Sequence, residues 1–151
     1  MTIRSYIAEN RARFMEEWAS LIRIPSISCQ PAHKDDMLRC AERWRELLLE
    51  AGAQHAEVMP SKGNPFVYAE YSPMEVEGER LEVKGKNIPT VLVYSHYDVM
   101  PVEPLDLWQS NPWEPTIREG RLYARGADDD KGQAMIQVKA FEYLVKHGLM
   151  N

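Results

Sequence analysis

Apolar residues recur at helical spacing in three segments of the chain. Over residues 3–22 most steps between apolar positions are three or four residues, and Pro25 prevents that helix from continuing. A second apolar stripe covers residues 36–51, and a third covers residues 131–147, where Gly148 suits the C-terminal end. The pattern therefore predicts helices over these three segments.

Shorter apolar or alternating runs lie between the second and third predicted helices. They predict strands over residues 55–59, 66–71, 81–83 and 89–95, and a hairpin over residues 117–124. The run from 89 to 95 is β-branched and apolar on both faces, which predicts a strand in the centre of a sheet. Because helices come before, between and after the strands, we expect a layered α/β domain.

Length, charge and cysteine content narrow the class of protein. A chain of 151 residues suggests one domain. The formal net charge of −5 argues against a nucleic-acid-binding surface, which usually needs clustered basic residues. Two cysteines are too few for a disulfide scaffold, and no apolar stretch approaches the ~20 residues of a membrane helix. We therefore expect a cytoplasmic protein without nucleic-acid or membrane partners.

The first candidate for chemistry is the pair His96 and Asp98, at the C-terminal end of the predicted strand over residues 89–95. Alternate residues of an extended chain project to the same side, and ligands often bind at strand ends in α/β sheets. Histidine is a ligand for Zn²⁺, and a neighbouring aspartate can accept the other ring N–H and fix the tautomer. The alternative is an ordinary buried histidine followed by a turn aspartate.

The second candidate is a run of three carboxylates at residues 128–130, just before the third predicted helix. One interpretation is helix capping, in which Asp129 or Asp130 accepts free backbone N–H groups. The other is a carboxylate that bridges metal ions. The carboxylates do not alternate as in an EF-hand loop, and Lys131 precedes a glycine instead of following one at P-loop spacing.

Taken together, these segments resemble the zinc-dependent M20 metallopeptidases, which include carnosinase-like dipeptidases, glutamate carboxypeptidases and acyl-amino-acid deacylases. The sequence SHYDVMP at residues 95–101 matches the family's first motif, and ARGADDDKG at residues 124–132 matches its second. GRLYARG at residues 120–126 fits the dipeptidase branch, and LIRIPSIS at residues 21–28 resembles the family's helix-ending Ile-Pro-Ser segment. The resemblance implies a layered α/β/α zinc-peptidase-like catalytic domain.

The resemblance also implies a role for three residues. His96 is then a terminal ligand of one metal, Asp129 is the carboxylate that bridges two metals, and Asp98 is the catalytic aspartate that holds His96. Two Zn²⁺ ions are implied for the complete site, with Mn²⁺ or Co²⁺ as alternatives. We expect the coordinating atoms of His96 and Asp129 to lie within ~4–6 Å. A cis peptide between Asp129 and Asp130 is also implied, whereas Asp128 and Asp130 receive no metal role.

The activity implied by the resemblance is hydrolysis of a dipeptide, a short peptide or an acyl-amide bond by metal-activated water, in a homodimeric complete protein. Family members continue with a Glu-Glu pair, further metal ligands and a lid and dimerisation domain, which residues 1–151 lack. We therefore interpret residues 1–151 as the N-terminal part of the M20 catalytic domain. Alone, this part is expected to be inactive, to bind zinc weakly if at all, and to self-associate or be marginally stable. The alternative is a non-catalytic fragment that binds metal weakly or serves as a structural or interaction piece.

Overall fold

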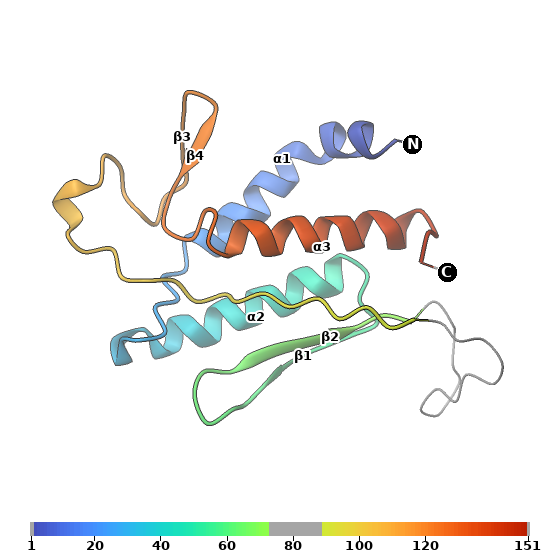
Figure 1. Cartoon of the computed structure of the whole chain (residues 1–151), viewed down its shortest axis with the longest axis horizontal. Coiled ribbons are helices and arrows are strands. Elements are labelled where there is room, and N and C mark those ends of the chain that lie inside the picture. Colours follow the sequence, from blue (N-terminus) through green and yellow to red (C-terminus); the bar gives the residue numbers. More distant parts are fainter. Residues whose placement is uncertain (1, 73–88, 151) are drawn as a thin grey trace.

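The computed structural model of the chain describes residues 2–72 and 89–150. Within these residues lie the helices α1 (Ile3–Ile22), α2 (Lys34–Glu50) and α3 (Lys131–Lys146), and the short 3₁₀ helices η1 (Pro31–His33) and η2 (Leu105–Leu107). Two antiparallel hairpins are formed by β1 (His55–Met59) with β2 (Phe66–Glu70), and by β3 (Thr116–Arg118) with β4 (Arg121–Tyr123). Figure 1 shows these elements in the whole chain.

The three predicted helices are confirmed, with bounds that differ from the prediction by no more than two residues. At the start of α1, the Thr2 side chain accepts a hydrogen bond from the Ser5 backbone N–H and the Ser5 hydroxyl bonds back to Thr2, which is a capping box. Helix α2 begins two residues earlier than the apolar stripe indicates, because η1 leads directly into it from Pro31. Helix α3 ends before Gly148, which has a positive φ of 62°.

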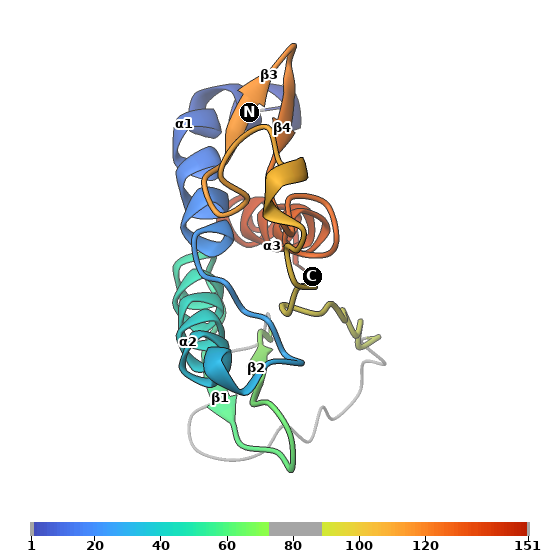
Figure 2. The same cartoon turned by 90° about the vertical axis from the view of Figure 1, so that its left-hand side faces the viewer.

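The core lies where the three helices pack together. Its central cluster is made of buried residues from all three: Leu21, Cys40, Trp44, Leu47, Ala51, Ala134, Met135 and Val138. The β1–β2 hairpin packs against α2. In the two views α3 lies between α1 and the extended segment of residues 89–100 (Figures 1 and 2). The described chain is therefore a mixed α/β structure, as the sequence indicates.

The sheets differ from the prediction in one important respect. The strands predicted at residues 55–59 and 66–71 and the hairpin predicted at residues 117–124 are confirmed, but within the described residues they form two separate two-stranded antiparallel sheets. Residues 89–95 are extended and pair with no strand among the described residues, so the prediction of a central strand there is wrong. The residues predicted as a strand at 81–83 lie outside the described part of the chain.

The physical reason for this difference is the lack of a partner for the extended segment. A strand that is apolar on both faces needs a neighbouring strand on each edge and a covering layer on each face. The described residues place no strand beside either edge of this segment. Val91, Leu92 and Tyr94 are largely exposed, and Leu92 is 90% exposed. The apolar pattern identifies an extended segment correctly, but ladder pairing depends on residues distant in the sequence.

No helix in the part of the chain that the structure describes is long and apolar enough to span a bilayer.

Candidate metal centre

The two segments selected from the sequence meet at the imidazole ring of His96. Its Nδ1 lies 3.0 Å from Oδ1 of Asp98, and its Nε2 lies 3.1 Å from Oδ1 of Asp129. The expected convergence is confirmed, at a distance shorter than the expected range. A metal ion ~2.0–2.2 Å from each of two ligand atoms holds those atoms roughly 3–3.5 Å apart. The observed separation therefore suits two ligands of one ion.

Tight packing of the backbone positions Asp129. Gly126 has a φ of 78°, and a Cβ there would lie 2.7 Å from Cγ1 of Val99. A Cβ on Gly132 would lie 2.1 Å from the carbonyl oxygen of Ala127. Only glycine fits at either place, so the loop before α3 lies close against the residues that follow His96. The peptide between Asp129 and Asp130 is cis, as the resemblance implies.

Asp130 connects the two segments in a way that the sequence does not indicate. Its Oδ2 accepts a hydrogen bond of 3.0 Å from the backbone N–H of His96. Asp130 also stands at the N-terminal boundary of α3, but its side chain makes no capping hydrogen bond there. The capping interpretation therefore does not describe Asp130, whose carboxylate holds the backbone of His96 instead. The hydroxyl of Ser95 adds a second link, donating to Oε1 of Gln137 on α3 at 3.0 Å.

Lys131 ties the same loop to the end of α1. Its side chain is fully buried, and Nζ donates to the carbonyl oxygens of Leu21 and Ile24, both at 2.8 Å. These carbonyls lie at and just after the end of α1, and each also accepts one backbone N–H, from Ile24 and Ser26 respectively. Burial lowers the pKa of Lys131. Sequence reasoning missed this role, although a lysine at the start of a helix, where the macrodipole disfavours a cation, is a usable signal.

The two carboxylates beside His96 shift the pKa of its imidazole upward. Burial alone lowers the pKa of His96, but hydrogen bonds with Asp98 and Asp129 outweigh it, so the pKa lies above its ordinary value. The side chains remain open to solvent: that of His96 is 44% exposed and that of Asp129 is 84% exposed. An ion can therefore reach Nε2 of His96 and the Asp129 carboxylate.

The nitrogen and oxygen donors of this site suit a metal ion, such as Zn²⁺, that is intermediate between hard and soft. Imidazole nitrogen and carboxylate oxygen are both ligands of Zn²⁺. Among residues 2–72 and 89–150, no group of three or more His, Cys, Asp or Glu side chains comes together to hold an ion. His96 and Asp129 thus supply two protein ligands, and a site of three or four ligands needs others. His33 is engaged elsewhere, with Nδ1 2.7 Å from Oδ2 of Asp36.

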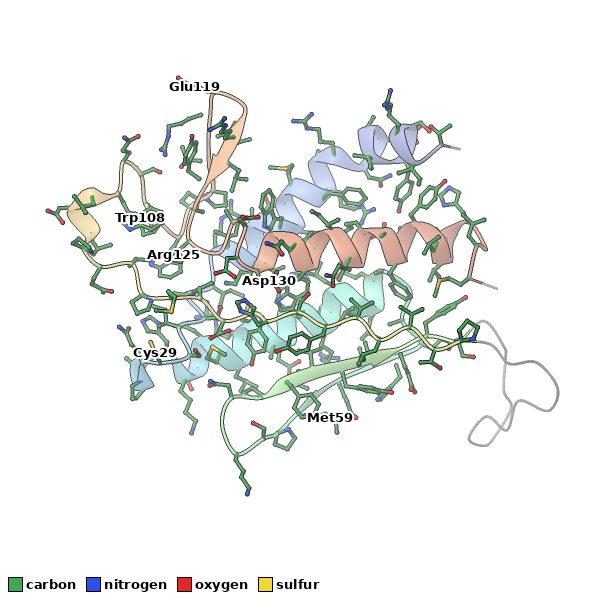
Figure 3. All side chains as sticks on the ribbon, viewed as in Figure 1. Cys29, Met59, Trp108, Glu119, Arg125 and Asp130 are labelled. Atoms are coloured by element: carbon green, nitrogen blue, oxygen red, sulfur yellow. The ribbon has the colours of Figure 1, made fainter. Side chains whose placement is uncertain are left out.

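A pocket of about 460 Å³ lies next to this centre. Its lining residues include Trp108, Arg118, Tyr123 and Asp128, and Asp128 directly precedes Asp129 in the chain. The Trp108 indole N–H donates to a carbonyl oxygen of the same loop, and the Arg125 guanidinium lies 5.2 Å from the indole ring centroid. Figure 3 shows Trp108 and Arg125 side by side, with Asp130 at the start of α3. Trp108 therefore both packs the loop and shapes the pocket wall.

Comparisons with known proteins converge on one group. Residues 92–151 match the model of the family described as peptidase family M20/M25/M40. Cysteinylglycine-S-conjugate dipeptidase of Corynebacterium striatum is 31% identical over 142 residues, which cover 94% of this chain and 29% of that protein. Succinyl-diaminopimelate desuccinylase of Azoarcus sp. is 48% identical over 62 residues, which cover 41% of this chain and 16% of that protein.

The solved structures agree with this grouping. A metallo-carboxypeptidase from Sulfolobus solfataricus, described as of the M20 family, superposes with a TM-score of 0.72 at 32% identity. The match covers 89% of this chain and 28% of that protein. The chain thus spans less than a third of the length of each of these relatives.

Proposed function

Because this chain belongs to the M20 family of peptidases, we propose that the whole protein is a metal-dependent hydrolase that cleaves a dipeptide, a short peptide or an acyl-amide bond. The observation that carries the proposal is the meeting of His96 Nε2 and Asp129 Oδ1 at 3.1 Å. Dipeptidase, carboxypeptidase and desuccinylase, the activities in the names of the relatives, share the hydrolysis of an amide bond.

The proposed cofactor is a pair of Zn²⁺ ions, with His96 as a terminal ligand of one and Asp129 as the bridging carboxylate. When bound, such ions acidify a coordinated water to a pKa of ~7 and polarise the carbonyl of the substrate. Mn²⁺ or Co²⁺ would accept the same nitrogen and oxygen donors. Since the chain spans less than a third of each relative, we assign the remaining ligands and the glutamate that takes the proton of the water to the rest of the whole protein.

The residues of this chain act by holding the ligands in place. Asp98 accepts the Nδ1–H of His96, which leaves the lone pair of Nε2 for an ion and raises its basicity. Asp130 accepts the backbone N–H of the same residue, and buried Lys131 ties the turn to the end of α1. Such preorganisation reduces the rearrangement needed when ion and substrate bind.

We propose a homodimer in the cytoplasm that acts on a small peptide or acyl-amino-acid substrate. The net charge of −5 supports the absence of a nucleic-acid partner, because such partners usually require clustered basic residues.

The test is to measure zinc content and hydrolysis in the whole protein, with a dipeptide and an N-succinyl amino acid as alternative substrates. We expect bound zinc and turnover of one substrate class, both lost with a chelator and in His96→Ala. His55→Ala is the matched control, because His55 is exposed and lies on the β1–β2 hairpin. Hydrolysis that persists in His96→Ala, or that resists complete removal of metal, would refute the proposed role of this metal centre. A whole protein that neither retains zinc nor hydrolyses either substrate would favour the non-catalytic alternative.

A further inference from the structure

We propose that Ser28 is a positioning residue for the metal centre, which acts on His96 through Asp98; the inference rests on the proposed function of that centre. The Ser28 hydroxyl donates a short hydrogen bond to Oδ2 of Asp98. The other oxygen of the same carboxylate, Oδ1, lies 3.0 Å from Nδ1 of His96. Each carboxylate oxygen thus has its own partner, and the three side chains form one continuous row.

The chain that leaves α1 is placed to perform this role. Ser26, which is fully buried, donates from its hydroxyl to the carbonyl oxygen of Tyr97 at 2.7 Å. The backbone N–H of Val99 donates in return to the carbonyl oxygen of Ser26 at 2.9 Å. Residues 26–28 therefore bind the backbone on both sides of Asp98. Within the described residues, Ser28 makes the only hydrogen bond from this segment to the side chain of Asp98. In Figure 1 the segment that follows α1 crosses the extended chain that precedes η2.

A hydroxyl at position 28 has a clear physical effect on Asp98. The terminal torsion of an aspartate is broad, so a carboxylate held at one oxygen can still rotate. The Asp98 side chain is 38% exposed, so water can compete for the oxygen that faces Ser28. A hydrogen bond from a hydroxyl to an ionised carboxylate is charge-assisted and short. Fixing Oδ2 thereby fixes the plane of the carboxylate and the direction in which Oδ1 meets the imidazole.

This role accounts for a sequence feature that the metal ligands leave unexplained. The segment of residues 21–28 carries two serines after Pro25, and both contact the stretch that follows His96. Ser26 holds the backbone, whereas Ser28 holds the side chain. The next residue, Cys29, is exposed in the same loop and serves as a matched control position.

The experiment measures zinc affinity of the whole protein by competition with a chromophoric chelator. Groups that orient a metal-ligating histidine typically contribute 10–100-fold to metal affinity. For Ser28→Ala we expect a loss of about tenfold, at the lower end because Ser28 acts one residue further from the metal. Ser28→Thr keeps the hydroxyl and should restore most of the affinity, and Cys29→Ala should leave it unchanged. In hydrolysis, Ser28→Ala should lower kcat with little change in KM.

A second readout does not depend on bound metal. In the ¹⁵N–¹H spectrum of the metal-free whole protein, the Nδ1–H of His96 is assigned by its disappearance in His96→Ala. We expect a sharp, protected signal in the unsubstituted protein and in Ser28→Thr, and an exchange-broadened signal in Ser28→Ala. If the unsubstituted protein binds no zinc, the proposed function fails, while this spectrum still decides whether Ser28 holds Asp98.

A double substitution separates positioning from a general effect on folding. If Ser28 acts through Asp98, Ser28→Ala should cause no further loss of zinc affinity in an Asp98→Ala background. Unchanged zinc affinity and an unchanged His96 signal in Ser28→Ala would overturn the proposal, as would an equal loss in the Asp98→Ala background. If Ser28→Ala does not fold, the pair Ser28→Thr and Ser28→Val decides the same question. The proposal requires the threonine variant to bind zinc more tightly than the valine variant.

Discussion

Replacement of Glu142 by alanine is expected to weaken the packing of α1 against α3. The Glu142 carboxylate is fully buried between these helices and accepts hydrogen bonds from four side chains. Tyr6 and Arg13 on α1 donate at 2.5 Å, and Lys139 and Lys146 on α3 donate at 2.8 Å. Removing one carboxylate therefore leaves three cations and one hydroxyl without their shared acceptor.

The expected loss of stability depends on whether each donor finds another hydrogen-bond partner in the variant. Breaking a buried ion pair by removing one partner costs about 3–5 kcal/mol. The side chains of Arg13 and Lys146 are 37% and 46% exposed, so both can return to water. Lys139 keeps a salt bridge with Glu17, but the Tyr6 hydroxyl loses its partner in the interior. We therefore expect Glu142→Ala to lower the free energy of unfolding by about 3 kcal/mol.

Urea denaturation of the 151-residue chain, followed by tryptophan fluorescence, measures this change. Glu16→Ala is the matched control, because Glu16 is an exposed glutamate on α1 that pairs with Arg23 at 2.8 Å. Exposed pairs contribute about 0–1 kcal/mol, so the control should unfold almost as the unsubstituted chain does. Equal losses of stability in the two variants would refute the reasoning, because burial would then make no difference.

The pH dependence supplies an independent check on the same group. Burial raises the pKa of Glu142, but hydrogen bonds from Arg13, Lys139, Lys146 and Tyr6 outweigh it and hold the pKa far below the usual 4.5. A carboxyl with a lowered pKa in the folded state stabilises the fold above its unfolded pKa and loses this effect as pH falls. The stability difference between the unsubstituted chain and Glu142→Gln should therefore be full at neutral pH and shrink below pH ~4.5. A stability difference between the two proteins that does not change with pH would contradict the lowered pKa of Glu142.

Three further variants test the residues that hold the metal centre. Asp130→Ala should lower the zinc affinity of the whole protein about tenfold, because the backbone N–H of His96 loses its acceptor. Asp128 is exposed, so Asp128→Ala should leave the zinc affinity unchanged. Competition with a chelator measures the affinity of both variants. Lys131→Met keeps the apolar stem but removes both hydrogen bonds of the buried ammonium, while the two carbonyls keep only their backbone donors. Urea denaturation should therefore show a loss of about 1.5–3 kcal/mol. Gly126→Ala combines a φ of 78° with a 2.7 Å clash and should lower the free energy of unfolding by at least about 2 kcal/mol in the same assay. A tolerated Gly126→Ala, or an Asp128→Ala variant as weak in zinc binding as Asp130→Ala, would count against this arrangement.

Features of the fold that depend on nearby residues could be predicted from the sequence. The three helices follow from apolar spacing and from Pro25 and Gly148 near their ends. Glu119 and Gly120, both with positive φ, form the turn of the predicted β3–β4 hairpin. The segment of residues 89–95 shows the limit of this reasoning, because its apolar pattern carries no information about which strand pairs with it.

The candidate site divides in the same way. His96, Asp98 and Asp129 could be selected because they belong to short motifs, and the structure brings them together. The groups that hold them could not, because each acts across a long separation: Ser28 reaches Asp98 70 residues away, and Lys131 reaches the carbonyl of residue 21, 110 residues away. Serine and lysine have ordinary surface roles in most sequences, so only the fold reveals these contacts.

The most direct test is the position of zinc in a crystal of the zinc-loaded whole protein, located by anomalous scattering at the zinc absorption edge. We predict one ion ~2.0–2.2 Å from both Nε2 of His96 and a carboxylate oxygen of Asp129, and a second ion on the other oxygen of the same carboxylate. Zinc bound elsewhere, with the side chains of His96 and Asp129 both free of metal, would contradict the assignment of this site.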